Sequence, residues 1–345
     1  MSKRALRIGI NGFGRIGRAV TRILLDGQRH RLVHINDINP DPANLAYLLK
    51  YDTIYGRIDR RIEGTPEGLV IDDATIRVSH VPALGEVDWK ASEVDVVIEA
   101  SGVSLNEQHA RRIADELAPV IVTHAAPSAD YTLVFGATER GFDPRIHRVV
   151  STSICDAIAA APVLKTLHDA FGVEFGFITT LHPWLSYQNL MDGPARSQAY
   201  PGTTYSHYPL GRASVGALIP KPTTVVSACE RIVPELAGRL KCMSYRVPTP
   251  CVSSGDMTLH LERDATEATV LDALRALETT QHGRQVVRIT DEPLISVDFL
   301  KDPHSCIIDT RWLMLNRGRQ LKIVLWYDNE WGYSSRVADA VDRFA

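Results

Sequence analysis

Hydrophobic residues in the first 150 positions recur in short apolar runs separated by stretches of helical periodicity. The runs that predict strands are residues 5–11, 32–36, 94–100, 120–123 and 132–136. An amphipathic pattern over residues 16–27 predicts a helix directly after the first run. Strands that alternate with helices are typical of a parallel sheet covered on both faces. We therefore predict an α/β domain over residues 1–152.

The pattern changes after about residue 150. A helical stretch at 156–171 precedes longer segments of alternating polarity, at residues 175–182, 240–247, 257–262 and 320–327. Longer strands with few crossover helices favour a mixed or antiparallel sheet, so we predict an α+β domain over residues 153–328. A polar stretch rich in turn formers, residues 191–212, predicts a long ordered loop. Residues 334–344 predict a closing helix.

Composition narrows the classes of protein. A chain of 345 residues fits about two domains, and a formal net charge of −3 gives no reason to expect nucleic acid or a membrane as partner. No apolar stretch approaches the roughly 20 residues of a spanning helix. The five cysteines form no CxxC pair, so we expect neither disulfides nor a metal site, and we expect a cytoplasmic protein.

A glycine motif follows the first predicted strand. Gly12, Gly14 and Gly17 have the spacing GxGxxG and lead into the helix, and Asp37 ends the second strand about 20 residues on. In this context the glycines allow a tight turn and close approach of a pyrophosphate to the helix N-terminus. A carboxylate at Asp37 would accept ribose hydroxyls and repel a 2′-phosphate. We therefore predict a Rossmann domain that binds NAD, against the alternative that the glycines form only a tight turn.

One cysteine stands where a strand gives way to a helix. Cys155 lies at the predicted N-terminus of the helix 156–171, where the positive end of the helix dipole lowers the pKa of a thiol. His182 ends a predicted strand of the same domain and could act as its base. These positions predict a nucleophile and base pair, with a plain buried cysteine as the alternative.

Longer motifs resemble the glyceraldehyde-3-phosphate dehydrogenase family, which includes the erythrose-4-phosphate enzyme. In chain order they are NGFGRIGR, LLKYDTIYGR, VVIEASG, PELAGRL, YRVPTP and WYDNEWGYSSRV. The resemblance runs from about residue 7 to the C-terminus. The stretch PLISVDFLKDPHSCIID is closer to the erythrose-4-phosphate enzyme.

The resemblance implies an activity and a set of site residues. It implies NAD-dependent oxidation of an aldehyde, in which Cys155 forms a thiohemiacetal and then a thioester and His182 takes the proton. Asn329 would orient the nicotinamide carboxamide, and Arg246 would bind a substrate phosphate. The family's cofactor positions correspond to Asn11, Gly12, Phe13, Gly14, Arg15, Ile16, Asp37, Ser101 and Gly102. The resemblance also implies a homotetramer and a C-terminal helix, within residues 329–345, that returns to the NAD-binding domain.

The chain departs from the family where substrate and phosphate bind. The family usually reads SCTTN around the nucleophile, whereas this chain reads ICDAI, with Ile154 and Asp156 in place of two hydroxyl side chains. Asp156 would repel inorganic phosphate and, if charged, oppose thiolate formation. The remaining substrate-binding candidates are Leu185, in place of a threonine, Arg212, which survives at the end of the long loop, and Thr223.

These departures leave the cofactor motifs intact. We therefore expect an active dehydrogenase that acts on a small phosphorylated or otherwise anionic aldehyde, with inorganic phosphate or water resolving the thioester. One alternative is an erythrose-4-phosphate-type or other non-phosphorylating aldehyde dehydrogenase with a changed substrate. Another, of a different class, is an NAD-binding regulatory protein that has lost catalysis.

Overall fold

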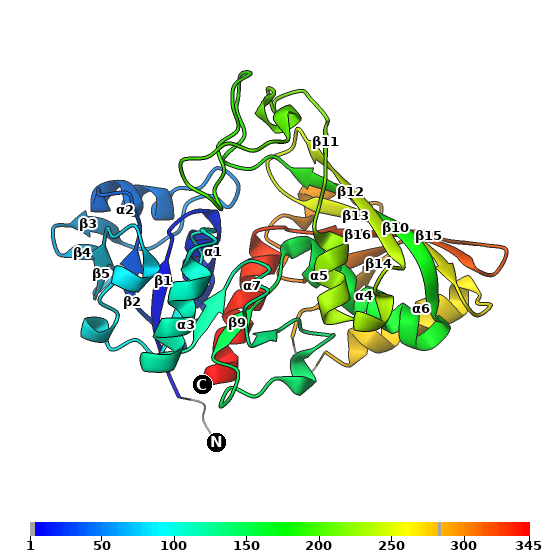
Figure 1. Ribbon diagram of the computed structural model, residues 1–345, viewed down its shortest axis with the longest axis horizontal. Coiled ribbons are helices and arrows are strands. Elements are labelled where there is room, and N and C mark those ends of the chain that lie inside the picture. The colour runs from blue at the N-terminus through cyan, green and yellow to red at the C-terminus, as the bar shows by residue number, and fades with distance from the viewer. Residues whose placement is uncertain (1–3, 282–283) are drawn as a thin grey trace. The chain divides into compact units, whose positions relative to one another are not determined.

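The computed structural model describes residues 4–281 and 284–345, which form two compact units (Figure 1). The first unit comprises residues up to 133, together with 142–153 and 334–345. The second comprises residues 134–141 and 154–333. Each unit has its own sheet, so the α/β and α+β parts of the predicted fold class are both confirmed.

The first unit is built on a nine-stranded sheet. Its strands, in spatial order, are β3 (Ile62–Thr65), β4 (Gly68–Ile71), β5 (Ala74–Ser79), β2 (Arg31–Asn36), β1 (Arg7–Asn11), β6 (Val96–Glu99), β7 (Val120–Val122), β9 (Val149–Ser151) and β8 (Tyr131–Thr132). From β5 to β8 every pairing is parallel. The helices of this unit include α1 (Arg15–Gly27), α2 (Pro42–Lys50) and α3 (Asn106–Glu116).

Two details of this sheet differ from the sequence prediction. The run at 132–136 was expected to be one strand, but β8 ends at Thr132 and a turn follows. The strands β3, β4 and β5, which follow one another in antiparallel pairs, were not predicted. Of these, β3 and β4 are four residues long, too short for an alternating pattern to be recognised.

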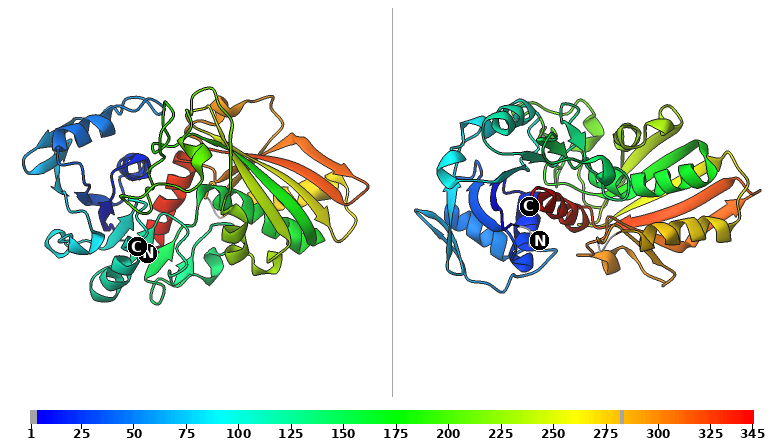
Figure 2. Two further views of the ribbon diagram at one scale, coloured as in Figure 1. Left: turned by 45° about the horizontal axis from the view of Figure 1, so that its top comes forward. Right: turned by 90° about the horizontal axis from the view of Figure 1, so that it is seen from below.

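The second unit is built on a seven-stranded mixed sheet. Its strands, in spatial order, are β11 (Ile219–Lys221), β12 (Leu240–Val247), β10 (Val173–Pro183), β13 (Ser253–Leu261), β16 (Gln320–Tyr327), β15 (Cys306–Asn316) and β14 (Val287–Thr290). One face of this sheet is covered by three helices, α4 (Cys155–Phe171), α5 (Val225–Ile232) and α6 (Glu267–Thr279) (Figures 1 and 2). Of these, α4 contacts both α5 and α6.

Alternation along the central strand sets the two faces of this sheet. In β10, Ile178, Thr180 and His182 are buried, whereas Phe175, Phe177 and Leu181 are exposed. Since successive side chains of a strand point to opposite faces, the buried set faces α4. The polar residues of that set, Thr180 and His182, lie where the site described below is built.

The remaining elements are short, apart from the C-terminal helix. α7 (Trp331–Val341) begins in the second unit and continues into the first. Short 3₁₀ helices occur at Leu84–Glu86, Lys90–Ser92, Glu139–Gly141, Tyr208–Gly211, Pro234–Leu236, Ser296–Phe299 and Asp342–Phe344. Within the described part of the chain, no helix has the length and apolar character needed to cross a membrane.

Candidate active site

Strand register in the second unit aligns several functional side chains on one face of its sheet. Arg246 of β12 pairs with His182 of β10, and it pairs with Ile219 of β11 on its other side. Tyr327 of β16 pairs with Ser253 of β13, which is level with His182 because Leu181 pairs with Ser254. Residues directly opposite one another share a face. The sheet therefore presents a row of buried polar side chains toward α4.

The candidate nucleophile enters this row from α4. Cys155 is the first residue of the helix, and Ser153, two residues earlier, has a left-handed φ of 59°. The Sγ of Cys155 lies 3.7 Å from Nε2 of His182. The two residues that the sequence predicted as nucleophile and base are thus brought into contact.

The hydrogen bonds of His182 define its tautomer. Its Nδ1 lies 2.8 Å from the carbonyl oxygen of Pro183, which can only accept, so Nδ1 carries the proton. Burial, together with the charge of Arg246, lowers the pKa of His182 to about 4. The imidazole is therefore neutral at pH 7, and its unprotonated Nε2 faces the thiol.

The thiol itself differs from the expectation based on its helix. A helix N-terminus lowers the pKa of a cysteine, but the pKa of Cys155 is raised well above its usual value. Burial is the main cause, and the negative charge of Asp156 adds to it. Arg246 acts in the opposite direction without prevailing. Cys155 is therefore a protonated thiol at neutral pH, and it reacts only if a neighbouring base takes its proton.

Asp156 belongs to the same group of contacts. Its Oδ1 accepts from the Cys155 thiol at 3.5 Å and from the Tyr327 hydroxyl at 2.8 Å. Burial and the charge of Asp156 raise the pKa of Tyr327 well above its usual value, so this hydroxyl remains a donor. Sequence reasoning placed Asp156 in the site but missed Tyr327, although Tyr327 is the second residue of the motif WYDNEWGYSSRV that contains Asn329.

A group of positive charge lies beside the nucleophile. Arg246 is buried, and its Nη2 donates to the Tyr187 hydroxyl at 3.2 Å. Its buried Nε has no hydrogen-bond partner among the residues that the structure describes. Lys221 pairs with Ser244, two residues before Arg246, and so lies on the same face of the sheet. Burial and the charge of Arg246 lower the pKa of Lys221 to about 8. Sequence reasoning missed Lys221, because this residue lies in none of the motifs that resemble the family.

The other residues predicted to bind substrate are placed as follows. Ile154 is half-buried and precedes Cys155 as the N-cap of α4, without a side-chain capping bond. Leu185 is half-buried, and its backbone N–H donates to the Gln188 side chain at 3.0 Å. Thr223 lies between β11 and α5, and its carbonyl accepts from the Cys242 thiol at 3.4 Å. Ile154 thus adjoins α4, and Leu185 and Thr223 lie two residues beyond the ends of β10 and β11.

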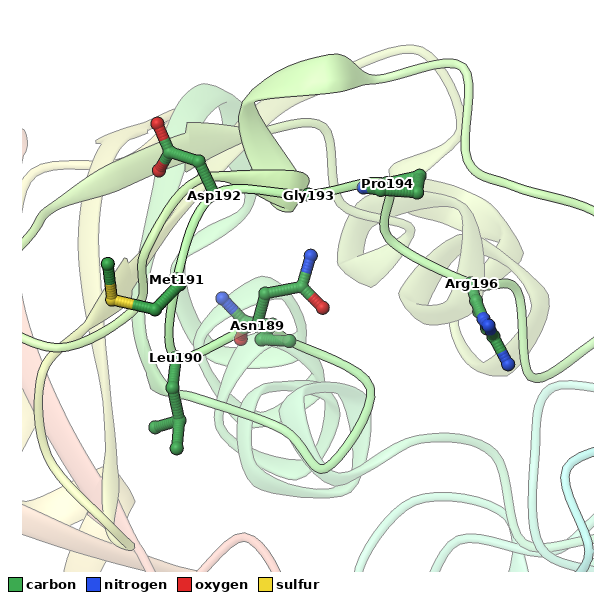
Figure 3. Close-up of a pocket in the computed structure, with 8 residues that line it drawn as sticks. Asn189, Leu190, Met191, Asp192, Gly193, Pro194 and Arg196 are labelled. Atoms are coloured by element: carbon green, nitrogen blue, oxygen red, sulfur yellow. The ribbon is translucent and has the colours of Figure 1, made fainter.

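Arg212 is not brought to this group. It is exposed and forms an ion pair with Asp192 at 2.9 Å, within the long loop. The beginning of this loop surrounds a separate open hollow of about 550 Å³ (Figure 3). Its lining includes Asn189, Leu190 and Arg196, and it includes neither Cys155 nor Arg246. The loop therefore closes largely on itself, by the ion pair and by a bridge between Arg196 and Thr204.

In the first unit, the glycine motif has the geometry expected of a dinucleotide site. A Cβ at Gly12, where φ is 90°, would lie 2.5 Å from the backbone of Ser101, and a Cβ at Gly17 would lie 2.1 Å from the carbonyl oxygen of Gly12. Nothing lies within 4 Å of a Cβ position at Gly14, which is the N-cap of α1. The helix N-terminus, with no side-chain cap, is thus open to a phosphate group.

Asp37 lies beside this turn. Its carboxylate accepts the backbone N–H of Phe13 at 2.6 Å and that of Asn39 at 2.9 Å. Arg15, the first residue of α1, forms an ion pair with Asp52, and Ile16 follows it in the same turn. The structure therefore joins the glycine turn to the acidic residue at the end of β2, as NAD binding requires.

The third part of the predicted cofactor site is a buried polar network. The Asn11 amide donates to Glu99, and its carbonyl oxygen accepts from Asn36 at 2.7 Å. Glu99 also accepts the backbone N–H of Ser101 at 2.8 Å, and burial raises the pKa of Glu99. Gly102 follows with a φ of 73°. Sequence reasoning missed Glu99. Its position at the end of a strand, within the motif VVIEASG, could have indicated a role in the site.

Asn329 lies in the second unit, two residues after Tyr327. It is buried, and its side-chain oxygen lies 3.7 Å from the thiol of Cys251. The neighbouring Asp328 accepts from the same thiol at 3.3 Å. Asn329 thus lies two residues beyond the end of β16, the strand that carries the partner of Asp156.

One group among the described residues has the geometry to hold a metal ion. It comprises Cys155, Asp156 and His182, whose ligand atoms all lie within 4.8 Å of one another. A sulfur, a nitrogen and a carboxylate oxygen are ligands that zinc accepts. Sequence reasoning expected no metal site, because it considered only cysteine pairs.

Comparisons with known proteins match both halves of the chain. Residues 6–107 match the family model described as glyceraldehyde 3-phosphate dehydrogenase, NAD binding domain, and residues 154–329 match the C-terminal domain of the same enzyme. The chain is 38% identical over 341 residues to a glyceraldehyde-3-phosphate dehydrogenase of Kitasatospora aureofaciens, covering 98% of this chain and 99% of the relative. It is 36% identical over 339 residues to glyceraldehyde-3-phosphate dehydrogenase 2 of Streptomyces avermitilis, covering 97% of each. It is 34% identical over 342 residues to glyceraldehyde-3-phosphate dehydrogenase 2 of Bacillus subtilis, covering 99% and 97%.

Proposed function

The chain belongs to the glyceraldehyde-3-phosphate dehydrogenase family, and we propose that it oxidises a small phosphorylated or otherwise anionic aldehyde with NAD, through a thioester on Cys155. Membership and the NAD-binding domain follow from the two family models and the full-length relatives. The observation that carries the proposal is the contact of 3.7 Å between Cys155 Sγ and His182 Nε2, next to Arg246.

The protein residues account for formation of the covalent intermediate. The thiol proton passes to Nε2 of His182, which is unprotonated and faces it, and Sγ then bonds to the aldehyde carbon. NAD, when bound, supplies the hydride acceptor that makes the resulting thiohemiacetal a thioester. Burial of His182 opposes its protonation, so the proton transfer accompanies attack rather than preceding it.

Arg246 and Lys221 support an anionic substrate. A buried guanidinium whose Nε lacks a partner is a fork ready for a phosphate or carboxylate oxygen. Lys221 adds a second positive charge on the same sheet face. Ile154, Leu185 and Thr223 would then contact the rest of the substrate. Arg212, exposed and paired with Asp192, is not part of this proposal.

For the cofactor, we propose that Gly12, Gly14 and the N-terminus of α1 hold the pyrophosphate and that Asp37 accepts from the adenosine ribose. The open space at Gly14 and the carboxylate beside the turn fit this group. The other proposed contacts are Asn11, Phe13, Arg15, Ile16, Ser101, Gly102 and Asn329.

We further propose a cytoplasmic homotetramer. The five cysteines, all of which the structure describes, form no disulfide, which suits a reducing compartment. The face of the second sheet that α4 does not cover exposes apolar side chains, including Phe177, Leu181 and Met243. Exposed apolar patches of this kind mark interfaces, and the family resemblance names a second copy of the chain as the partner.

The proposal is tested by NADH formation at 340 nm. Purified protein is given glyceraldehyde 3-phosphate or erythrose 4-phosphate, each with and without inorganic phosphate. Matched variants are Cys155→Ser, which should abolish turnover, and Arg246→Ala, which should raise KM by about 100-fold because a charged contact of roughly 3 kcal/mol is lost. Retained NAD binding together with a Cys155 that does not react with any aldehyde would instead favour a regulatory NAD-binding protein.

A further inference from the structure

We infer that Asp156 is a catalytic base that activates water, so that water rather than inorganic phosphate releases the product from Cys155. The inference rests on the proposed function, because it concerns the thioester formed on that cysteine. The inference identifies water as the acceptor of the acyl group and Asp156 as the residue that activates the water. The product would be a carboxylic acid and not an acyl phosphate.

Position is the first argument for this role. Oδ1 of Asp156 lies 3.5 Å from Sγ of Cys155, and the acyl carbon of the thioester is one covalent bond from Sγ. A water molecule that donates to the carboxylate at the usual distance of about 2.6–3.2 Å is therefore within reach of that carbon. No other carboxylate among the described residues contacts the thiol.

The carboxylate is also held in place by two regular elements. Asp156 lies in the first turn of α4, where the helix N-terminus stabilises a negative charge. The Tyr327 hydroxyl, at the end of β16, donates to it at 2.8 Å. Both residues are buried. A base fixed between a helix and a strand keeps its orientation when the neighbouring sulfur becomes acylated.

The same residue disfavours phosphate as acceptor. An ionised carboxylate only accepts hydrogen bonds, so it offers nothing to phosphate oxygens and repels their charge. Ile154, on the other side of Cys155, provides no side-chain donor either. Arg246 could attract a phosphate, but the substrate's own anionic group is the natural partner for its fork.

The proposed step balances without any further reactant. Asp156 takes one proton from water as the water oxygen bonds to the acyl carbon, and the C–S bond then breaks with its electron pair going to Sγ. The proton held by Asp156 passes to Sγ along the contact that already joins them. The thioester and water thus become a carboxylic acid and the free thiol, with no change of oxidation state.

Asp156 should consequently have opposite effects on the two halves of the reaction. Its charge raises the pKa of Cys155 and so slows attack by the thiol. As a base it speeds hydrolysis of the acyl-enzyme. A residue with a merely structural role would not move these two rates in opposite directions when it is replaced.

The test uses 4-nitrophenyl acetate, which acylates a reactive cysteine without NAD or an aldehyde. The initial burst of 4-nitrophenolate counts live Cys155, and the steady rate that follows measures release of the acetyl group. We expect Asp156→Asn to keep the burst, to slow release by about 100-fold or more, and to quicken alkylation by iodoacetamide. Asp156→Thr, which restores the family's hydroxyl, should release acetate slowly in buffer alone and faster when phosphate is added.

The matched control is Asp169→Asn, on the exposed end of the same helix, where Asp169 pairs with Lys165 at 2.8 Å. It should behave as the unchanged protein does. All assays contain EDTA, because Sγ of Cys155, the Asp156 carboxylate and the His182 ring could together hold an adventitious metal ion. Release at an unchanged rate in Asp156→Asn, or release from the unchanged protein that requires phosphate, would overturn the inference. Absence of any burst would instead show that Cys155 is not a nucleophile, and the proposed function would fail with it.

Discussion

Burial shifts the pKa values of several side chains around Cys155. Burial raises the pKa of the thiol, lowers that of His182 to about 4 and lowers that of Lys221 to about 8. Each shift disfavours the charged form, as expected when a group leaves water. At neutral pH the thiol and the imidazole are therefore uncharged, whereas Lys221 is still largely protonated. Of these three groups, Lys221 is the one that changes its charge within the usual assay range.

This leads to a prediction for the pH dependence of substrate binding. Because the pKa of Lys221 is about 8, its positive charge is present below pH 8 and is lost as the pH rises through that value. KM for an anionic aldehyde should rise across pH 8. In Lys221→Met we expect KM to be about tenfold higher at pH 7, or roughly 1.4 kcal/mol, and to lose this inflection.

The control for this prediction is Lys241→Met, on the exposed face of β12. Initial rates over pH 6.5 to pH 9, measured with saturating NAD, give KM for both variants. A KM that rises across pH 8 equally in Lys221→Met and in the unchanged protein would show that Lys221 does not contact the substrate.

At the scale of elements, the site depends on where strands and helices end. In the second unit, β10, β12 and β16 bring His182, Arg246 and Tyr327 onto one sheet face, and α4 begins at Cys155 over that face. In the first unit, β1 ends before the glycine turn, and β2 ends before Asp37. In each unit, the polar residues of its candidate site thus lie near or just beyond the ends of strands.

The end of β2 carries the next prediction. The carboxylate of Asp37 already accepts two backbone N–H groups, so its charge is held beside the glycine turn. Asp37→Asn keeps the shape of the side chain but removes the charge. We expect NAD to bind about tenfold more weakly and NADP to be discriminated against less, because the repulsion of a 2′-phosphate is lost.

Isothermal titration calorimetry with both nucleotides measures this change. Asp26→Asn, an exposed position on α1, provides the matched control. If Asp37→Asn bound NAD and NADP with the same ratio as the unchanged protein, the ribose contact assigned to Asp37 would be wrong.

The sequence allowed prediction of those parts of the fold that have a strong local pattern. The helix at 156–171 was found as α4 from Cys155, and the strand at 175–182 was found within β10. The pairing of Cys155 with His182 was also predicted, because one residue begins a predicted helix and the other ends a predicted strand of the same domain. Lys221 and Tyr327 could not be predicted, because their place beside Arg246 and Asp156 depends on strand register, which brings together residues 25 to 171 positions apart. The raised pKa of Cys155 depends on burial, which a sequence pattern does not quantify.

At the scale of the whole molecule, one face of the second sheet exposes apolar side chains that nothing in the single chain covers among the described residues. Phe177 pairs with Thr258, Thr258 with Lys322 and Lys322 with Met314, so all four share this face. Phe177 is 60% exposed and Met314 46%. A large apolar side chain on a sheet face stabilises the protein only if another surface covers it. The stabilisation is about 25 cal/mol per Å² of apolar surface buried.

We therefore expect Phe177→Asp to separate the proposed tetramer. The substitution places a charge where a second copy of the chain would bury an aromatic ring, and an unpaired buried charge costs several kcal/mol. Light scattering coupled to size exclusion should give a mass of about four chains of 38.2 kDa for the unchanged protein and a smaller assembly for the variant. Asp169→Lys, a charge change on α4 and therefore away from this face, tests whether charge alone has this effect. Since Phe177 points away from Cys155, NADH formation per chain should fall only if the site depends on assembly. A single-chain mass for the unchanged protein would show that this sheet face has another partner.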